Sequence, residues 1–521
     1  MKAILFVFLL TNFVLSSYGA NILGIFTSYS PSHNIIHMSE VDALIQKGHN
    51  VTVITALPLK QKNPKYHHVY IPPAPQVQKL LEDTMEQISN AKGLENMKIM
   101  VIMMKAMINL QYDIMFTDQF QNVIHGDTKY DLVLLGYVMN DFYLAAAYQM
   151  KVPVVVSWVN FPMSAVNTLV GNPNAISYVP HPMISNVQPM GFINRFKTFI
   201  LSTFMYGVEK FMHYKLEQYY EEYKDIMKLS ELPEYQELQR NISLVIGNSH
   251  FSDGVIRANV PAYVEVGGIQ VKPEQNPLDN DLKEFLDNSS AQGAIFFSMG
   301  SNIKVSSLDP KVVEVFYNVL SKVNQNVVWK WEDPSNVPGN SKNIFYRNWL
   351  PQDDILAHKN VKLFVTHGGK GSIVESQYHG VPMIGLPVFG DQPGNAKLMV
   401  DDGYGLLLDY QTMSEEDFRN SIEEVLSNRT YTDNIQRFSK VYRDRPMSAR
   451  DTAVYWIEYV MRHHGALHMQ SPLVHSNIFV QYSLDVVGFL FLVIFIFVKI
   501  VKLCFSCAFK KRVCKTKVKK N

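Results

Sequence analysis

One glycine-rich stretch, residues 363–397, most constrains how this chain can fold, and it reads LFVTHGGKGSIVESQYHGVPMIGLPVFGDQPGNAK. Its first residues, Leu363–Thr366, are apolar and partly β-branched, which is typical of a buried parallel strand. A His-Gly-Gly turn ends that strand, a helix is expected over Ser372–His379, and a second apolar strand follows at Met383–Val388. The stretch therefore predicts a strand–turn–helix–strand unit. Its turn amides and its positive helix end suit an anionic phosphate group.

An ordinary capping box, in which Ser372 and Glu375 satisfy the first turn of the helix, explains these two residues without any ligand. The complete stretch carries more information, because His-Gly-Gly is followed at fixed offsets by Ser and Glu, then by Pro-x-x-Gly-x-Pro and Asp-Gln. This string resembles the signature of the UDP-glycosyltransferases. Upstream, Trp349-Leu350-Pro351-Gln352 resembles the family's uracil-binding element. The chain looks most like an insect-type member of that family.

The rest of the chain alternates apolar strands with helices. A strand at Asn21–Thr27, a helix at Ile35–Lys47 and a strand at Val51–Thr55 form a βαβ start, which is typical of a doubly wound sheet. A second alternating set begins at Ala294–Ser298, after a polar, proline-containing linker at Val271–Asp287. Periodicity thus indicates an α/β protein of two domains. The resemblance implies the GT-B fold, with two Rossmann-like domains facing across a cleft: an acceptor-binding domain over 21–270 and a UDP-sugar-binding domain over 271–470.

Both ends of the chain carry apolar segments. Residues 1–20 combine Lys2, an apolar run and small residues at the end, which predicts a secretory signal peptide. Residues 484–504 are almost entirely apolar and predict a single transmembrane helix, and the basic tail at 505–521 satisfies the positive-inside rule. We therefore expect a single-pass type I protein of the endoplasmic reticulum, with its catalytic domains in the lumen and a Lys-rich retrieval signal at the end of its tail.

Charge and cysteine content exclude several classes. The net charge of +1 depends on nine Lys and Arg residues beyond residue 498, which leaves residues 1–498 at about −8, so a nucleic-acid partner is not expected. All three cysteines lie at 504, 507 and 514, so the expected lumenal part has neither a disulfide nor a cysteine nucleophile. Asn-x-Ser/Thr motifs predict glycans at Asn241, Asn288 and Asn428, whereas Asn50 falls at a strand start and is expected to stay unmodified.

Glycosyl transfer needs a base for the acceptor hydroxyl, and the resemblance assigns that role to His33, which follows the first strand. A helix-entry histidine with a structural hydrogen bond is the alternative. Relatives orient the base with an acid after the strand at Tyr130–Leu135, but here that position is Gly136. Asp141 is the nearest acid and is the predicted partner of His33; a simple helix cap beside Phe142 explains it equally well.

The resemblance also assigns the residues that bind the nucleotide and the sugar. Trp349 would stack on uracil, and Gln352 would hydrogen-bond the edge of that base. Glu375 would accept hydrogen bonds from the ribose hydroxyls. Asp391 and Gln392 would hold the hydroxyls of the transferred sugar.

The diphosphate has its own set of expected contacts. His367 and Ser372 would touch it, with help from turn amides near Gly369 and from Ser301 after the first strand of this half. Gly371 stands where many relatives carry Asn, so one contact is expected to be missing. No Asp-x-Asp element is present in the expected cleft segments, and the resemblance implies neither a metal nor another cofactor beyond the UDP-sugar co-substrate.

Together these features predict an inverting UDP-glycosyltransferase that moves a sugar, with glucose favoured, from UDP-sugar to a hydroxyl of small lipophilic acceptors. The expected partners are the UDP-sugar, the acceptor and the membrane, and a homo-oligomer is left open. Because Gly136 replaces the usual acid, a catalytically impaired protein of the same fold, which binds UDP-sugar or a lipophile, is the alternative. A nucleotide-sugar epimerase of the same fold is a weaker one.

Overall fold

The computed structural model describes residues 19–59, 63–91, 93–181, 184, 188–289 and 292–518. Most of the expected signal peptide and the last three residues of the expected retrieval signal lie outside these residues. The chain divides into two compact units, one up to Gln470 and one from Ser471 onward. The first unit holds two parallel β-sheets, as the two alternating sets in the sequence predict.

The first sheet has seven strands in the order β3-β2-β1-β4-β5-β6-β7, and every pair is parallel. The strand order reverses direction between β1 and β4, as in doubly wound folds. Buried apolar side chains fill these strands because helices cover both faces of such a sheet. The strands are β1 Asn21–Phe26, β2 Asn50–Thr55, β3 Tyr66–Tyr70, β4 Leu132–Gly136, β5 Val154–Trp158, β6 Ile242–Gly247 and β7 Tyr263–Glu265.

The helix after β1 determines where the expected base lies. Helix α2 begins at Pro31, four residues earlier than predicted, because proline is favoured in the first turn of a helix. His33 therefore lies inside the first turn of α2.

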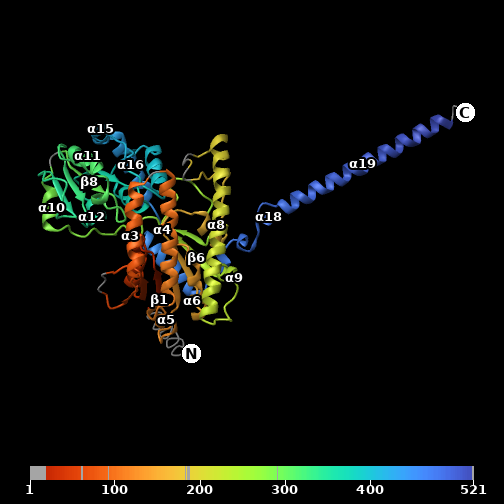
Figure 1. The fold of residues 1–521 in the computed structure, drawn as a ribbon, viewed down its shortest axis with the longest axis horizontal. Helices are drawn as coiled ribbons and strands as arrows, with labels where there is room; N and C mark the ends of the chain where they lie inside the picture. The colour runs from red at the N-terminus through yellow and green to blue at the C-terminus, as the bar shows by residue number, and fades with distance from the viewer. Residues whose placement is uncertain are drawn as a thin grey trace, which may run out of the picture. The chain divides into compact units, whose positions relative to one another are not determined.

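Figure 1 shows α3, α4 and α8 running side by side along one side of this sheet. The remaining helices are α3 Pro75–Asn90, α4 Gly93–Ile114, α5 Asp118–His125, η1 Asp141–Tyr143, α6 Leu144–Met150, α7 Ser164–Val170, α8 Phe192–Ile226 and α9 Tyr235–Arg240.

The second sheet has six parallel strands in the order β10-β9-β8-β11-β12-β13, which reverses between β8 and β11. Its strands are β8 Ala294–Ser298, β9 Asn326–Lys330, β10 Ile344–Arg347, β11 Val361–Thr366, β12 Met383–Gly385 and β13 Gly405–Leu407. Its helices are α10 Asn280–Asp287, η2 Val305–Ser307, α11 Pro310–Leu320, α12 Gln352–Leu356, α13 Lys370–His379, α14 Gln392–Asp401, α15 Glu415–Ser427 and α16 Arg429–Arg443.

Two segments differ from the domain limits expected from sequence. The linker expected at 271–287 contains helix α10, whose Leu282 and Leu286 are fully buried in the core of the second sheet. The last helix of the expected second domain, α17 Ala449–Arg462, packs instead into the core of the first sheet through Ala453 and Ile457. The chain thus crosses back to its first domain.

The second unit contains the apolar helix α19, Leu484–Val518, preceded by the short helix α18, Ile478–Gln481. Within α19, Leu484–Cys507 is long and apolar enough to span a membrane, with a mean hydropathy of 2.7. Its apolar side chains are exposed, so they do not form a core within this unit. This helix is consistent with the predicted transmembrane segment at 484–504.

Candidate active site

In doubly wound sheets, ligands bind beyond the carboxyl ends of the strands, at the point where the strand order reverses. In the first sheet this point lies between β1 and β4, and His33 follows β1 while Gly136 ends β4. In the second sheet it lies between β8 and β11, and Ser301 and His367 follow those strands. The topology therefore places the expected base and the expected donor residues at the two points that this fold uses for ligands.

The expected base, His33, is partly exposed, and its Nδ1 lies 3.3 Å from the Oγ of Ser28. Burial lowers the pKa of His33 to about 4, and the charge of Asp391 opposes that effect by raising the pKa. Asp391 belongs to the second domain, so this charge reaches His33 from across the two domains. A neutral imidazole near a carboxylate can accept a proton at ordinary pH.

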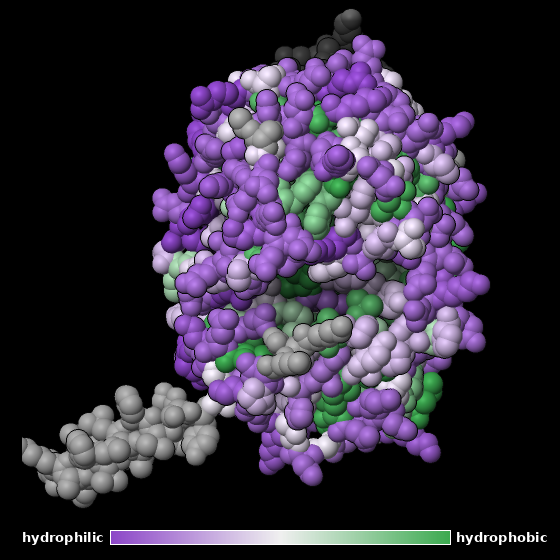
Figure 2. All heavy atoms as spheres, turned by 90° about the vertical axis from the view of Figure 1, so that its left-hand side faces the viewer, coloured by the Kyte–Doolittle hydropathy of each residue, from purple (hydrophilic) through white to green (hydrophobic). Residues whose placement is uncertain are grey.

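Direct hydrogen bonds join the two domains beside these residues. The Nδ2 of Asn160, after β5, donates to Oδ2 of Asp391 over 3.1 Å, and Asn395 donates to the same oxygen over 2.7 Å. Close by in sequence to His33, Ser30 accepts a hydrogen bond of 3.2 Å from Asn302 of the second domain. The face drawn in Figure 2 is hollowed across its middle. Residues from both domains therefore meet around one site.

The structure does not pair Asp141 with His33 as the sequence analysis predicted. Asp141 is fully buried at the start of η1, and its Oδ2 accepts a hydrogen bond of 2.8 Å from the hydroxyl of Tyr235. Burial raises the pKa of Asp141, while the charge of His213 and the hydroxyl of Tyr235 act in the opposite direction. The helical turn at 141–143 directs this carboxylate toward α8 and α9 instead of toward α2. The alternative, in which Asp141 caps the helix beside Phe142, also lacks support. The N-cap residue of η1 is Asn140, and its side chain makes no capping hydrogen bond.

Three of the expected donor residues come together in the second domain. The Nε2 of Gln352 donates to the Oγ of Ser372 over 3.1 Å and to Oε2 of Glu375 over 2.8 Å. Burial raises the pKa of Glu375 to about 8, and the negative charge of Asp353 acts in the same direction. This cluster offers a hydroxyl and a carboxyl group on the face of α13 that a nucleotide would meet.

The start of α13 excludes the capping-box reading of its first residues. The helix begins at Lys370 with Gly369 as N-cap, so Ser372 and Glu375 lie inside it, and no side chain caps its amides. Uncapped amides at a helix N-terminus are well suited to a phosphate group. The residues that looked like a cap thus remain available for a ligand.

The histidine of the His-Gly-Gly turn lies in a close-fitting space beside that N-terminus. A Cβ atom on Gly369 would stand 2.4 Å from the Nε2 of His367, so glycine is required there for the ring to fit. Burial lowers the pKa of His367 to about 4, and the nearby Lys330 charge acts in the same direction, so the ring is neutral at pH 7. The hydroxyl oxygen of Ser301 is buried without a hydrogen-bond partner among the described residues.

The remaining expected donor residues differ in availability. Trp349 is 56% exposed, so its indole is free to stack on a base. Gln392 is buried, and its Oε1 accepts hydrogen bonds from the amides of Val388 and Phe389, so only its amide nitrogen remains available to a sugar. Gly371 leaves open space at the position where relatives carry Asn, because its missing Cβ would have nothing closer than 4.0 Å.

Several groups at the site were missed by the sequence analysis. Lys370, the first residue of α13, is buried and forms an ion pair with the buried Asp253 of the first domain. Asn160 was also missed, although it holds Asp391. Nothing local in the sequence indicates these pairs, because their members are 117 and 231 residues apart.

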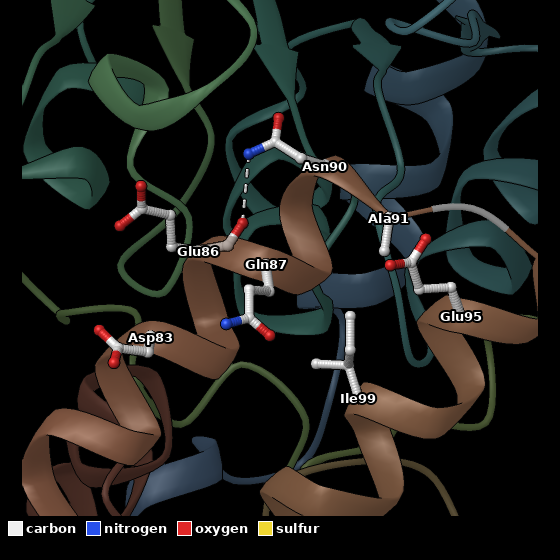
Figure 3. Close-up of a pocket in the computed structure, with 7 residues that line it drawn as sticks. All are labelled: Asp83, Glu86, Gln87, Asn90, Ala91, Glu95 and Ile99. Atoms are coloured by element: carbon white, nitrogen blue, oxygen red, sulfur yellow. Dashed lines mark hydrogen bonds between the residues drawn. The ribbon is translucent and has the colours of Figure 1, made fainter.

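A cavity of about 530 Å³ lies between α3 and α4, away from the expected site residues. Figure 3 shows carboxylate side chains around it, and Asn90 bonded to the backbone of Glu86. A lining this rich in carboxylates does not suit a lipophilic acceptor. The residues that line it are Asp83, Glu86, Gln87, Asn90, Ala91, Glu95 and Ile99.

The predicted glycan sites lie at the surface. Asn241, Asn288 and Asn428 are all exposed, at the ends of α9, α10 and α15. Asn50 is also exposed, and its Nδ2 donates to Oδ1 of Asn21 within the strand pair.

The sequence of this chain is similar to those of known glycosyltransferases. The family model described as UDP-glucoronosyl and UDP-glucosyl transferase matches residues 20–521. The chain is 32% identical to UDP-glycosyltransferase UGT5 of Dactylopius coccus, covering 96% of this chain and 93% of the relative. It is 30% identical to human UDP-glucuronosyltransferase 1A6, covering 94% of this chain and 92% of that one.

Solved structures agree on the fold. A UDP-glucosyltransferase from Polygonum tinctorium that glucosylates indoxyl superposes with a TM-score of 0.55 at 15% identity, covering 86% of this chain and 99% of that one. The glycotransferase of kitacinnamycin gives 0.54 at 15% identity, covering 85% and 99%. With two doubly wound parallel sheets, the chain has the GT-B fold expected from its sequence.

Proposed function

We propose that this chain, which belongs to the family of UDP-glucuronosyl and UDP-glucosyl transferases, moves glucose with inversion from UDP-glucose to a hydroxyl of a small lipophilic acceptor. One observation carries this proposal: the charge of Asp391 in the second domain acts on His33 of the first, and Asn160 of the first domain bonds to that carboxylate. A base on one domain and a sugar-holding carboxylate on the other would bring acceptor and donor together.

The chemistry follows from the protonation state of His33. With its pKa lowered to about 4, the imidazole is neutral above that pH and can accept the proton of an acceptor hydroxyl. The hydroxyl oxygen then forms a bond to the anomeric carbon while the bond from that carbon to the UDP oxygen breaks. Because the attack comes from the face opposite UDP, the configuration at the anomeric carbon inverts.

The departing diphosphate would be stabilised by neutral donors and a helix end. The uncapped N-terminus of α13 supplies amides, and the buried hydroxyl of Ser301 supplies an unused donor. The neutral imidazole of His367 lies in the same turn. Trp349 would stack on uracil, and Glu375 would accept the ribose hydroxyls. We propose that the reaction needs no metal ion.

The choice of glucose follows the resemblance to insect members. One such relative, UDP-glucosyltransferase 2 of Dactylopius coccus, is 31% identical and covers 96% of this chain. The human relative is a glucuronosyltransferase, so the two donors must be compared directly. UDP release should be measured with UDP-glucose and with UDP-glucuronate, each against a panel of phenols.

Faster UDP release with UDP-glucose is the expected result. Faster release with UDP-glucuronate would refute the choice of sugar but not the transfer. Absence of acceptor-dependent release with either donor, in a protein that still binds UDP, would favour the alternative of a binding protein.

We also propose that the GT-B domains lie in the lumen of the endoplasmic reticulum, anchored by a single pass of α19. The spanning part, Leu484–Cys507, is followed by a run of Lys and Arg that favours a cytosolic tail. Protease treatment of sealed microsomes should then shorten the chain by only its tail. Digestion of the folded domains would refute this orientation, and an unchanged mass after treatment with an N-glycosidase would refute the three glycan sites.

A further inference from the structure

A buried polar chain lies one helical turn beyond the expected base and has no role in the mechanism above. It consists of His37 and Glu40 on α2 and Ser157 on β5, all of which are at most 1% exposed. The Nδ1 of His37 lies 2.7 Å from the Oγ of Ser157, and that hydroxyl donates to Oε1 of Glu40 over 2.8 Å. These three side chains lie against the apolar core of the first sheet, near other buried polar residues of α2 such as Asn34 and Ser39.

The hydrogen bonds are consistent with a proton on the Nδ1 of His37. When Ser157 donates its one hydroxyl proton to Oε1 of Glu40, which can accept it whether or not Oε2 is protonated, the Nδ1 of His37 donates to the serine oxygen. The Nε2 atom is then a bare acceptor. It is buried and has no hydrogen-bond partner among the described residues. Buried polar atoms nearly always have a partner, so this one requires an explanation.

The position of the ring supplies that explanation. The imidazole of His37 stacks on Phe26 of β1 with ring centroids 4.8 Å apart, and it lies against Gly136 at the end of β4. A Cβ atom on residue 136 would stand 2.8 Å from the Nε2 of His37. The ring therefore occupies the space that any side chain at position 136 would need. Gly136 is the position where the sequence analysis expected an acid.

His33 and His37 are four residues apart on α2, so their side chains lie on the same face of the helix. The charge of His33 contributes to lowering the pKa of His37, which places the two rings within electrostatic reach of each other. The ring of His37 thus lies one turn along α2 from the group that takes up a proton during transfer.

We propose that His37, Ser157 and Glu40 are positioning residues that orient His33 and stabilise its protonated form, in place of an acid at position 136. This inference rests on the proposed function. No proton leaves the network in this scheme: His33 takes the acceptor proton, and His37 stays neutral and places its unprotonated Nε2 at the position 136 end of the site. The polar chain behind it keeps the Nδ1 proton in place and so keeps Nε2 bare.

The network also predicts a pH dependence. The titratable groups around His37 are His33 and Glu40, which lie on the same helix. The neighbouring strands β1, β4 and β5 contribute Phe26, Gly136 and Ser157, which carry no charge. The charge of Asp391 acts on His33 from the second domain. Burial lowers the pKa of His37 to about 3 and raises that of Glu40 to about 8. Glu40 is therefore protonated at pH 7 and ionises near pH 8. Its negative charge then strengthens the polarisation of Ser157 and His37.

The test uses the full-length protein in microsomes, with four variants: His37→Phe, Ser157→Ala, Glu40→Gln and the matched control Ser243→Ala. Ser243 is a buried serine of the neighbouring strand β6 whose hydroxyl has no partner among the described residues. Turnover is followed as UDP release with UDP-glucose, or with UDP-glucuronate if that donor is faster, and 1-naphthol. Titration of His33 is followed as its pH-dependent modification by diethyl pyrocarbonate, read by mass spectrometry.

We expect His37→Phe and Ser157→Ala to lower kcat by about 10–100-fold, by analogy with the outer partners of metal-bound histidines. The KM for the donor should be unchanged, and the titration midpoint of His33 should fall in both. In Glu40→Gln, kcat should match the wild type at pH 7 but lack the rise that the wild type shows through pH 8. Ser243→Ala should behave as the wild type.

Unchanged kcat and an unchanged His33 midpoint in folded His37→Phe would overturn the inference. If that variant fails to bind UDP, the nearly isosteric Glu40→Gln decides: a wild-type pH profile in it would also overturn the inference. Absence of turnover in the wild type would refute the proposed function instead. The modification of His33 needs no acceptor, so it tests the network in that case too.

Discussion

The two switch points of this protein have the same strand topology but opposite local chemistry. At the first, between β1 and β4, a buried polar chain lies one helical turn from His33, and its hydrogen bonds join α2 to β5. At the second, between β8 and β11, the groups are left open: the amides of α13 are uncapped, the hydroxyl of Ser301 is unpartnered, and Trp349 is exposed. Topology fixes where a ligand binds, and the side chains decide which chemistry that place performs.

This contrast separates catalysis from donor binding, and removal of the base tests it most directly. His33→Ala should lower kcat by about 10²–10⁴-fold, the usual contribution of a general base. The affinity for UDP should stay unchanged, because the donor contacts lie in the second domain. Steady-state rates and calorimetry with UDP measure the two effects. Loss of UDP binding in a folded His33→Ala variant would break the comparison.

The uracil contact should give the next largest effect. Trp349→Ala should weaken UDP binding by about 1–3 kcal/mol, by analogy with the stacking of bases on aromatic side chains. Tyr455→Ala, which removes an aromatic ring that is 43% exposed on α17, is the matched control and should bind UDP as the wild type does. Calorimetry measures the affinity of both variants for UDP. Equal affinities would refute the stacking of uracil on Trp349.

Glu375 should give a smaller, pH-dependent effect at the same switch point. Its folded pKa is raised to about 8, so the carboxyl group is protonated at pH 7 and ionises as the pH rises through 8. The ionised form is the better acceptor for ribose hydroxyls, so the affinity of the wild type for UDP should increase between pH 7 and pH 9. Glu375→Gln should lack this increase. Parallel slopes for both proteins would contradict the ribose contact.

The smallest effect on turnover is expected at Asp141. Its carboxylate accepts a hydrogen bond from Tyr235 and does not contact His33, and an asparagine oxygen can accept the same bond. Asp141→Asn should therefore leave kcat within a few-fold of the wild type, whereas His37→Phe should not. If Asp141→Asn instead lowered kcat as strongly as His33→Ala, the pairing predicted from sequence would be restored.

Sequence patterns predicted the elements of the fold well where the signal is local. The apolar runs, the βαβ start and the position of α19 are confirmed, because a buried parallel strand and a membrane-spanning helix each require a continuous apolar segment. Errors arose where a weak local pattern competes with tertiary packing. Strand β3 reads His-His-Val between two tyrosines and was missed, and the linker expected at 271–287 contains α10, which the second core stabilises.

The sequence by itself predicted most of the donor half of the site, since all of its expected residues except Ser301 lie within one stretch and one short element upstream. A strand, a turn and a helix N-terminus that follow one another along the chain stay together in any fold that forms them. That is why Gln352, Ser372 and Glu375 could be grouped before the structure was known, and they do form one hydrogen-bonded cluster.

Only the tertiary structure decided the surroundings of the base. Asp141 looked like the partner of His33 because it lies close to Gly136, where the resembled family carries an acid, but its carboxylate bonds to Tyr235. The groups near this end of α2 come from distant positions. Ser157, 120 residues from His37, bonds to the ring of His37, and the charge of Asp391 in the other domain acts on His33. Strand order brings such residues together, and a buried polar group bonds to whichever partner lies within reach. The spacing of residues along the chain therefore does not predict which partner a buried polar group will have.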